Sequence, residues 1–125
     1  MTVLITMLRT HWIIITLLLL AVITLLSLTP SSSLPAVPGN DKIHHFIAYC
    51  VLMFLVALKR PRYQLLIGLF LICWSGGIEL LQPYVNRHSD WYDVLANGAG
   101  IGCGILYAQH IRACFAKKPI KEQIK

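Results

Sequence analysis

The stretch Trp12–Leu28 reads WIIITLLLLAVITLLSL and contains no charged residue. A helix needs about 20 largely apolar residues to cross the roughly 30 Å of hydrocarbon in a bilayer. Backbone groups in lipid have no water to bond, and the run shows no period-2 alternation, so we predict a transmembrane helix over residues 12–28. Because the run is longer than the 7–15 apolar residues typical of a secretory signal, we expect this helix to be retained.

Three more apolar segments follow, over residues 42–58, 63–82 and 93–111. The connections between them are short and contain proline, glycine or basic residues, which makes sequential helices antiparallel neighbours. We therefore predict an all-α membrane protein, a four-transmembrane-helix antiparallel bundle. It forms a single domain over residues 1–116, and residues 117–125 form a basic cytoplasmic tail.

The composition excludes several classes of protein. Hydrophobic residues make up 57% of the chain and charged residues only 13%, whereas a soluble domain carries roughly 25% charged residues. The chain cannot cover a water-facing surface, so a soluble enzyme, a disordered chain and a nucleic-acid binder are excluded. The net charge of +6 then reflects membrane topology and attraction to anionic lipid.

The orientation follows from the distribution of Lys and Arg, which gather on the cytoplasmic side of a membrane protein. The opposite side receives only Lys42 and Arg87. We therefore predict cytoplasmic N- and C-termini and a multi-pass protein of the cytoplasmic (inner) membrane. The predicted cytoplasmic side receives Arg9, Lys59, Arg60, Arg62, Arg112, Lys117, Lys118, Lys121 and Lys125.

Polar residues gather at the predicted outer ends of the helices. Such residues are costly inside a membrane and mark functional sites by default. Asp41 and His45 are spaced i, i+4 and share a helix face, and the same holds for Asp93 and Asn97. We predict a shallow binding site in the outer leaflet. Its residues are Asp41, Lys42, His45, Tyr49, Glu79, Gln82, Arg87, Asp90, Asp93 and Asn97.

Purely structural roles explain individual members of this cluster equally well. Asp41 and Asp90 stand where each would cap a helix. Glu79 would serve as an ion-pair partner that holds the bundle together. Gln82 and Asn97 would be hydrogen-bond links between helices.

Glycines of the last apolar segment form two overlapping G-x-x-x-G pairs, a spacing that allows helices to approach closely in lipid. We predict helix packing for these residues, with the opposing surface on the segment 63–82. The packing residues are Gly98, Gly100, Gly102 and Gly104, and the opposing ones are Gly68, Gly76 and Gly77.

Several of these residues form a recognisable pattern. The chain carries Asp41-Lys42-x-x-His45-Phe46-x-x-Tyr49, then Glu79-x-x-Gln82, Arg87, Asp90 and Asp93, and finally Asn97-x-x-Gly100-x-x-x-Gly104. This order resembles the VanZ-like family of small bacterial integral membrane proteins, over about residues 41–104. The resemblance implies a membrane protein linked, through the founding member of the family, to resistance against the glycopeptide teicoplanin. It implies no mechanism.

Two functions remain open. The first is a non-enzymatic protein whose outer site binds a cell-envelope or glycopeptide-type ligand, with a role in envelope integrity or teicoplanin resistance. The alternative is a membrane-embedded enzyme on a lipid-linked envelope substrate, with His45 as acid/base and Glu79 or Asp93 orienting it. No S-G-H, H-E-x-x-H or G-x-S motif supports catalysis, and no H-x-x-x-H spacing supports a metal. We expect no cofactor and no metal, and the lipid bilayer as the main partner.

Overall fold

The computed structural model describes residues 2–29, 41–59, 61–85 and 90–117, and within these ranges it contains helices and no strand. The prediction of an all-α chain is confirmed. The elements are α1 (Thr2–Thr10), α2 (Trp12–Leu28), α3 (Asp41–Lys59), α4 (Gln64–Leu81), a 3-10 turn η2 (Gln82–Val85) and α5 (Trp91–Lys117).

The helix boundaries differ from the sequence prediction mainly at the two ends of the chain. The helix α1 was not predicted, and a bend of 77° separates it from α2. Thr10 Oγ1 donates a hydrogen bond to Thr6 O, a local bond that often bends helices. The helix α5 continues to Lys117, because the charge of Arg112 limits a membrane span but does not end a helix. The loop expected over residues 30–40 and all but the first residue of the predicted tail lie outside the described residues.

The structure supports two or three of the four predicted membrane spans. Among the described residues, two helical segments are long and apolar enough to cross a membrane, Lys42–Lys59 and Gln64–Val85. The bent pair of α1 and α2 gives a third if it counts as one span. The helix α5 has the length but contains four glycines as well as Asn97, Gln109 and His110, which dilute its apolar residues.

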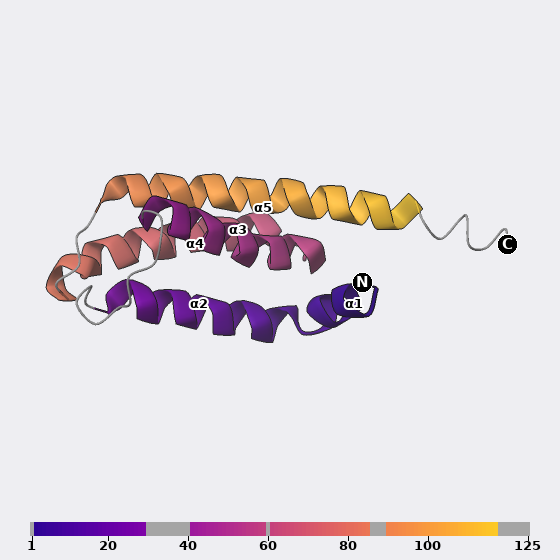
Figure 1. The fold of residues 1–125 in the computed structure, drawn as a ribbon, viewed down its shortest axis with the longest axis horizontal. Coiled ribbons are helices and arrows are strands. Elements are labelled where there is room, and N and C mark those ends of the chain that lie inside the picture. The colour runs from indigo at the N-terminus through magenta and orange to yellow at the C-terminus, as the bar shows by residue number, and fades with distance from the viewer. Residues whose placement is uncertain (1, 30–40, 60, 86–89, 118–125) are drawn as a thin grey trace, which may run out of the picture.

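The helices lie side by side (Figure 1). The helices α3 and α5 run in one direction, and α2 and α4 run in the other. The beginnings of α3 and α5 therefore lie at the same end of the molecule as the end of α4 and η2. The helix α1 and the last turn of α5 lie at the opposite end, as expected if both termini are on one side of a membrane.

The most extensive contact joins α3 and α5, two parallel helices that are not consecutive in the chain. A Cβ on Gly104 would lie 2.5 Å from Cys50 O and 2.9 Å from Phe54 N, and a Cβ on Gly100 would collide with Phe46 O. Only a residue without a side chain allows the two backbones to come this close. Two of the predicted packing glycines therefore lie in the α3–α5 contact.

The other glycines do not follow the prediction. A Cβ on Gly98 or Gly102 would meet nothing within 4 Å, and the same is true of Gly76 and Gly77. The surface opposite the α5 glycines is α3, not α4, although a Cβ on Gly68 of α4 would lie at ordinary contact distance from Ile101 Cγ2, at 3.7 Å. Glycine spacing identified the packing helix but not its partner, because four glycines spaced two apart cover more than one face of a helix.

The buried core lies around α3. Leu52, Met53 and Val56 are completely buried and pack with residues of α2, α4 and α5. The outer faces of α2 and α4 are exposed and apolar, which a monomeric soluble protein rarely shows over such an area but which suits contact with lipid. The exposed residues include Ile13, Ile14, Leu17, Leu18, Leu25, Leu65, Leu66, Leu69 and Phe70.

Candidate functional site

The beginning of α5 is fixed by two carboxylates. Asp90 Oδ1 accepts a hydrogen bond from Tyr92 N at 3.0 Å, so Asp90 caps the helix. Glu79 Oε2 in turn accepts a hydrogen bond from Asp90 N at 3.0 Å. In a capping box an acidic residue of the same helix receives that bond, whereas here it comes from α4. The carboxylate of Glu79 thus links the end of α4 to the start of α5.

Lys42 connects α3 to the same region. Its Nζ lies 2.7 Å from Asp90 Oδ2 and 3.7 Å from Asp93 Oδ1. The Lys42 side chain is 46% exposed, and that of Asp93 only 6%. Since an exposed ion pair contributes about 0–1 kcal/mol, the pair with Asp90 orients the residues more than it stabilises the fold.

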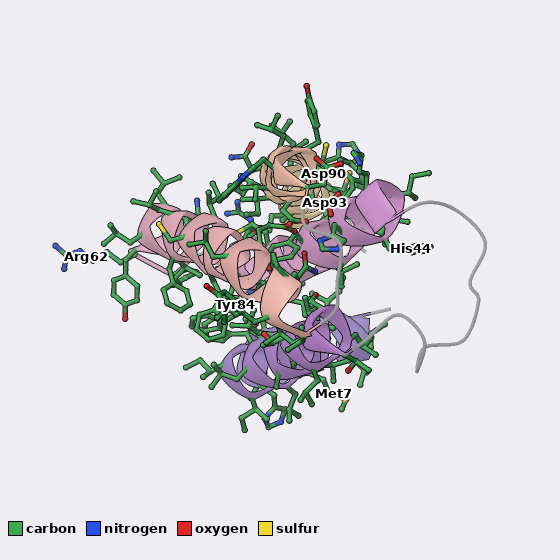
Figure 2. The ribbon with its side chains drawn as sticks, turned by 90° about the vertical axis from the view of Figure 1, so that its left-hand side faces the viewer. Met7, His44, Arg62, Tyr84, Asp90 and Asp93 are labelled. Carbon is green, nitrogen blue, oxygen red and sulfur yellow. The ribbon has the colours of Figure 1, made fainter. Side chains whose placement is uncertain are left out.

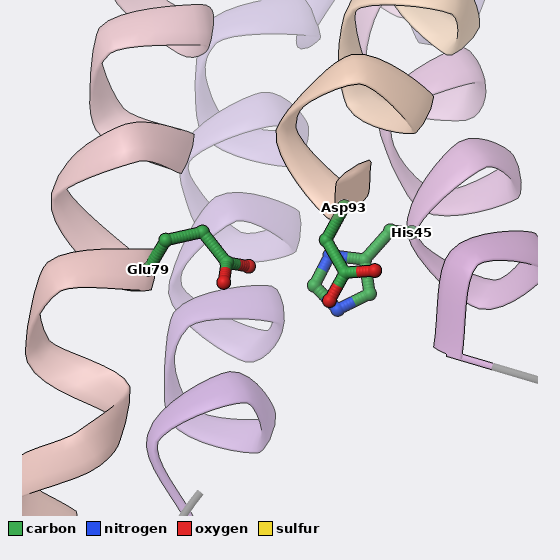
Figure 3. Close-up of side chains that lie close together, drawn as sticks. All are labelled: His45, Glu79 and Asp93. Carbon is green, nitrogen blue, oxygen red and sulfur yellow. The ribbon is translucent and has the colours of Figure 1, made fainter. Parts of the chain in front are cut away.

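A group of three side chains lies next to these ion pairs: His45, Glu79 and Asp93. One donor atom of each side chain lies within 4.8 Å of the others, and the three residues come from α3, α4 and α5 (Figure 3). Glu79 is 1% exposed and Asp93 4% exposed, while His45 is half-buried. An imidazole beside two carboxylates is able to move a proton, to bind a cation or to accept hydrogen bonds from a ligand.

A second polar layer lies deeper in the bundle. Asn97 Nδ2 donates a hydrogen bond to Ser75 Oγ, and the Tyr49 hydroxyl lies close to the same serine. All three side chains are 1% exposed. Because these residues again come from α3, α4 and α5, this layer fixes the three helices relative to one another and supports the residues above it.

The substitution Ser75→Ala should lower the free energy of unfolding by about 1–3 kcal/mol, because it leaves the buried amide of Asn97 without its acceptor. Ser27→Ala is the matched control: Ser27 is buried too, but its backbone oxygen accepts the bond from Gln82. Thermal unfolding in detergent measures both. Equal stability of the two variants would show that the Asn97–Ser75 bond contributes nothing measurable.

The helix α2 closes the remaining side of the cluster. Gln82 Nε2 donates a hydrogen bond to Ser27 O at 3.2 Å, and Trp74 Nε1 donates one to Thr24 Oγ1 at 3.0 Å. Gln82 is 1% exposed. The predicted role of Gln82 as a link between helices thus agrees with its contact to α2.

The structure places most of the predicted site residues together. Figure 2 shows Asp90 and Asp93 near the middle of this end, whereas His44 points outward. The side chain of Asp41 and all of Arg87 lie outside the described residues. Sequence reasoning missed Ser75, although its i, i+4 spacing to the buried Glu79 was a usable signal. The described members of the predicted cluster are Lys42, His45, Tyr49, Glu79, Gln82, Asp90, Asp93 and Asn97.

The apolar helices, the exposed apolar faces and the buried polar cluster define an all-helical membrane protein with a polar site at one end of its bundle. A family model described as VanZ/LLP1 matches residues 3–112. The chain therefore belongs to the VanZ/LLP1 family. The comparisons with curated proteins and with solved structures give no match.

Proposed function

We propose that this chain is a multi-pass protein of the bacterial cytoplasmic membrane with both termini in the cytoplasm. The polar end of the bundle then lies in the outer leaflet. The excess of Lys and Arg on the other side supports this orientation, as does the position of α1 and the last turn of α5 at the end opposite the cluster (Figure 1).

In this orientation, we propose that the polar cluster binds a cell-envelope or glycopeptide-type ligand. Buried acceptors carry this proposal: Gln82 Oε1, Asp93 Oδ1 and Asn97 Oδ1 have no hydrogen-bond partner among the described residues. Buried polar atoms are normally hydrogen-bonded. Acceptors held in this way suit a ligand rich in hydroxyl or ammonium groups, as cell-wall precursors and glycopeptides are. The founding member of the VanZ-like family is linked to teicoplanin resistance, which is consistent with this ligand class.

The test is a deletion strain of the host complemented with the wild type, with Glu79→Gln or with Gly102→Ala. Teicoplanin susceptibility and the pool of lipid-linked envelope precursors are measured at matched amounts of membrane protein. We expect the wild type and Gly102→Ala to restore the wild-type profile and Glu79→Gln to fail, because it removes a buried charge while keeping shape and hydrogen bonding. Full restoration by Glu79→Gln would contradict a binding role for the cluster.

One observation favours a second candidate. His45 lies within 4.8 Å of Glu79 and Asp93, an arrangement in which a carboxylate orients an imidazole for acid–base catalysis. A membrane-embedded enzyme on a lipid-linked substrate would make the deletion strain accumulate an unprocessed lipid and lose its product. A binding protein would leave the covalent species unchanged. Mass spectrometry of the same lipid extracts separates the two candidates.

A further inference from the structure

The group formed by His45, Glu79 and Asp93 has a feature that neither binding of an envelope ligand nor helix packing requires. Two carboxylates that are 1% and 4% exposed lie with an imidazole, with one donor atom of each residue within 4.8 Å of the others. Buried carboxylates this close repel each other unless a cation or a proton lies between them. Figure 3 shows the three side chains converging from three helices.

Lys42 only partly supplies that cation. Its Nζ lies 2.7 Å from Asp90 Oδ2 but 3.7 Å from Asp93 Oδ1, and Asp93 Oδ1 has no hydrogen-bond partner among the described residues. His45 Nδ1 is also buried without a partner among them. Both atoms are strong ligands for a metal ion, and buried polar atoms are normally satisfied.

We propose that His45, Glu79 and Asp93 bind one divalent transition-metal ion, with Zn²⁺ or Mn²⁺ as the fitting chemistry. One imidazole nitrogen and two carboxylate oxygens form a mixed set that suits these ions better than Ca²⁺ or Mg²⁺, which prefer oxygen ligands alone. A closed structural zinc site has four protein ligands, whereas sites with three keep a position open. The ion thus offers a coordination position to water or to a ligand.

Sequence reasoning brings His45, Glu79 and Asp93 to one end of the bundle, so a metal site there is imaginable, but it favours no metal for a physical reason. The expectation of no metal rested on spacings such as H-x-x-x-H, which place two ligands on one helix. Here α3, α4 and α5 contribute one ligand each, so no spacing within one helix reports the site. Only the packing of the three helices brings the donor atoms together.

The proposal does not depend on the envelope ligand and is tested without it. The full chain is purified in detergent, treated with EDTA and desalted, then titrated separately with ZnCl₂, MnCl₂, MgCl₂ and CaCl₂. Bound metal per chain is measured by mass spectrometry after equilibrium dialysis, and thermal stability is followed in parallel. We expect about one equivalent of Zn²⁺ or Mn²⁺ and, at 100-fold excess over Kd, a rise in Tm of roughly 5 °C or more.

Variants identify the ligands. His45→Asn and Asp93→Asn should each weaken metal binding by more than roughly 100-fold. Replacing a residue that only hydrogen-bonds to a metal ligand already lowers metal affinity by about 10–100-fold, and loss of a ligand itself should cost more. The matched control His44→Asn should bind as the wild type does, because His44 points away from the cluster (Figure 2). His110 and Cys114, 3.7 Å apart on the far part of α5, are competing ligands, so every titration is repeated in His110→Asn/Cys114→Ser.

The results decide in either direction. Saturable binding that survives His110→Asn/Cys114→Ser and is lost in Asp93→Asn supports the site. Absence of stoichiometric Zn²⁺ or Mn²⁺ in the wild type overturns it, and so does wild-type affinity in both His45→Asn and Asp93→Asn. If either variant does not fold, the wild type and the His110→Asn/Cys114→Ser chain still decide, since binding lost with His110 and Cys114 also overturns the proposal.

Discussion

Replacing Gly100 by leucine should remove most of the folded protein from the membrane. A Cβ at this position already collides with the backbone oxygen of Phe46, and a Cβ on Gly104 would lie 2.5 Å from Cys50 O. Neither contact is relieved by turning a side chain, so α3 and α5 must move apart. Even Gly100→Ala should lower the free energy of unfolding by about 1–3 kcal/mol, the usual effect of overpacking.

Gly102 provides a matched control on the same helix. A Cβ there would meet nothing within 4 Å, and alanine is about 1 kcal/mol more favourable than glycine inside a helix. Gly102→Ala should therefore hold or raise stability, and Gly102→Leu should leave the protein folded. Membrane abundance and thermal unfolding in detergent measure both pairs. If the Gly100 and Gly102 variants behave alike, the close contact between α3 and α5 is not what holds the bundle together.

Fusions of alkaline phosphatase should report the orientation as an all-or-none difference. The enzyme needs disulfides, which form outside the cytoplasm. Fusion after Asn40 or Asn86 should give activity, and fusion after Arg60 or Lys125 should give none, because the Lys and Arg excess holds the latter positions inside. Activity in the reverse pattern would place the polar cluster at the cytoplasmic face and remove the basis for an envelope ligand.

Much of the fold was accessible from the sequence. The uninterrupted apolar run over residues 12–28 coincides with α2, and α3 and α4 fall within a residue or two of the expected segments. Hydropathy reports where the apolar residues lie, so it locates such helices well. It does not report where the chain bends or how far a helix continues past its apolar residues. Therefore α1, which a bend of 77° separates from α2, and the last turns of α5 were missed.

Which helix packs against which was harder to predict. Short connections suggested that sequential helices pack best, but the closest contact joins α3 and α5. The deciding interaction is between the glycines of one helix and the backbone of another, at Phe46 and Cys50. Glycine is found easily in a sequence, whereas nothing in the sequence marks the backbone that it approaches.

The candidate site could be predicted only in outline, because the sequence does not report how helices contact one another. Spacings such as Asp93 to Asn97 placed polar residues on one face, and the alternation of helix direction placed these faces at one end. The sequence could not show that Ser75 accepts a hydrogen bond from Asn97 and lies close to Tyr49. Nor could it show that Glu79 accepts a hydrogen bond from Asp90, the cap of α5. These contacts depend on how the helices are rotated and how far apart they lie.

The most direct measurement of whether the cluster is a functional site is function per folded molecule in conservative variants. Asn caps a helix about as well as Asp, so Asp41→Asn tests the charge apart from the predicted capping role. Glu79→Gln and Asp93→Asn keep shape while removing a charge. In the complemented deletion strain, these variants should lose function while the amount of folded protein stays at the level of Gly102→Ala. Full function in all three, or a loss only in proportion to lost protein, would show that these residues are caps and links between helices.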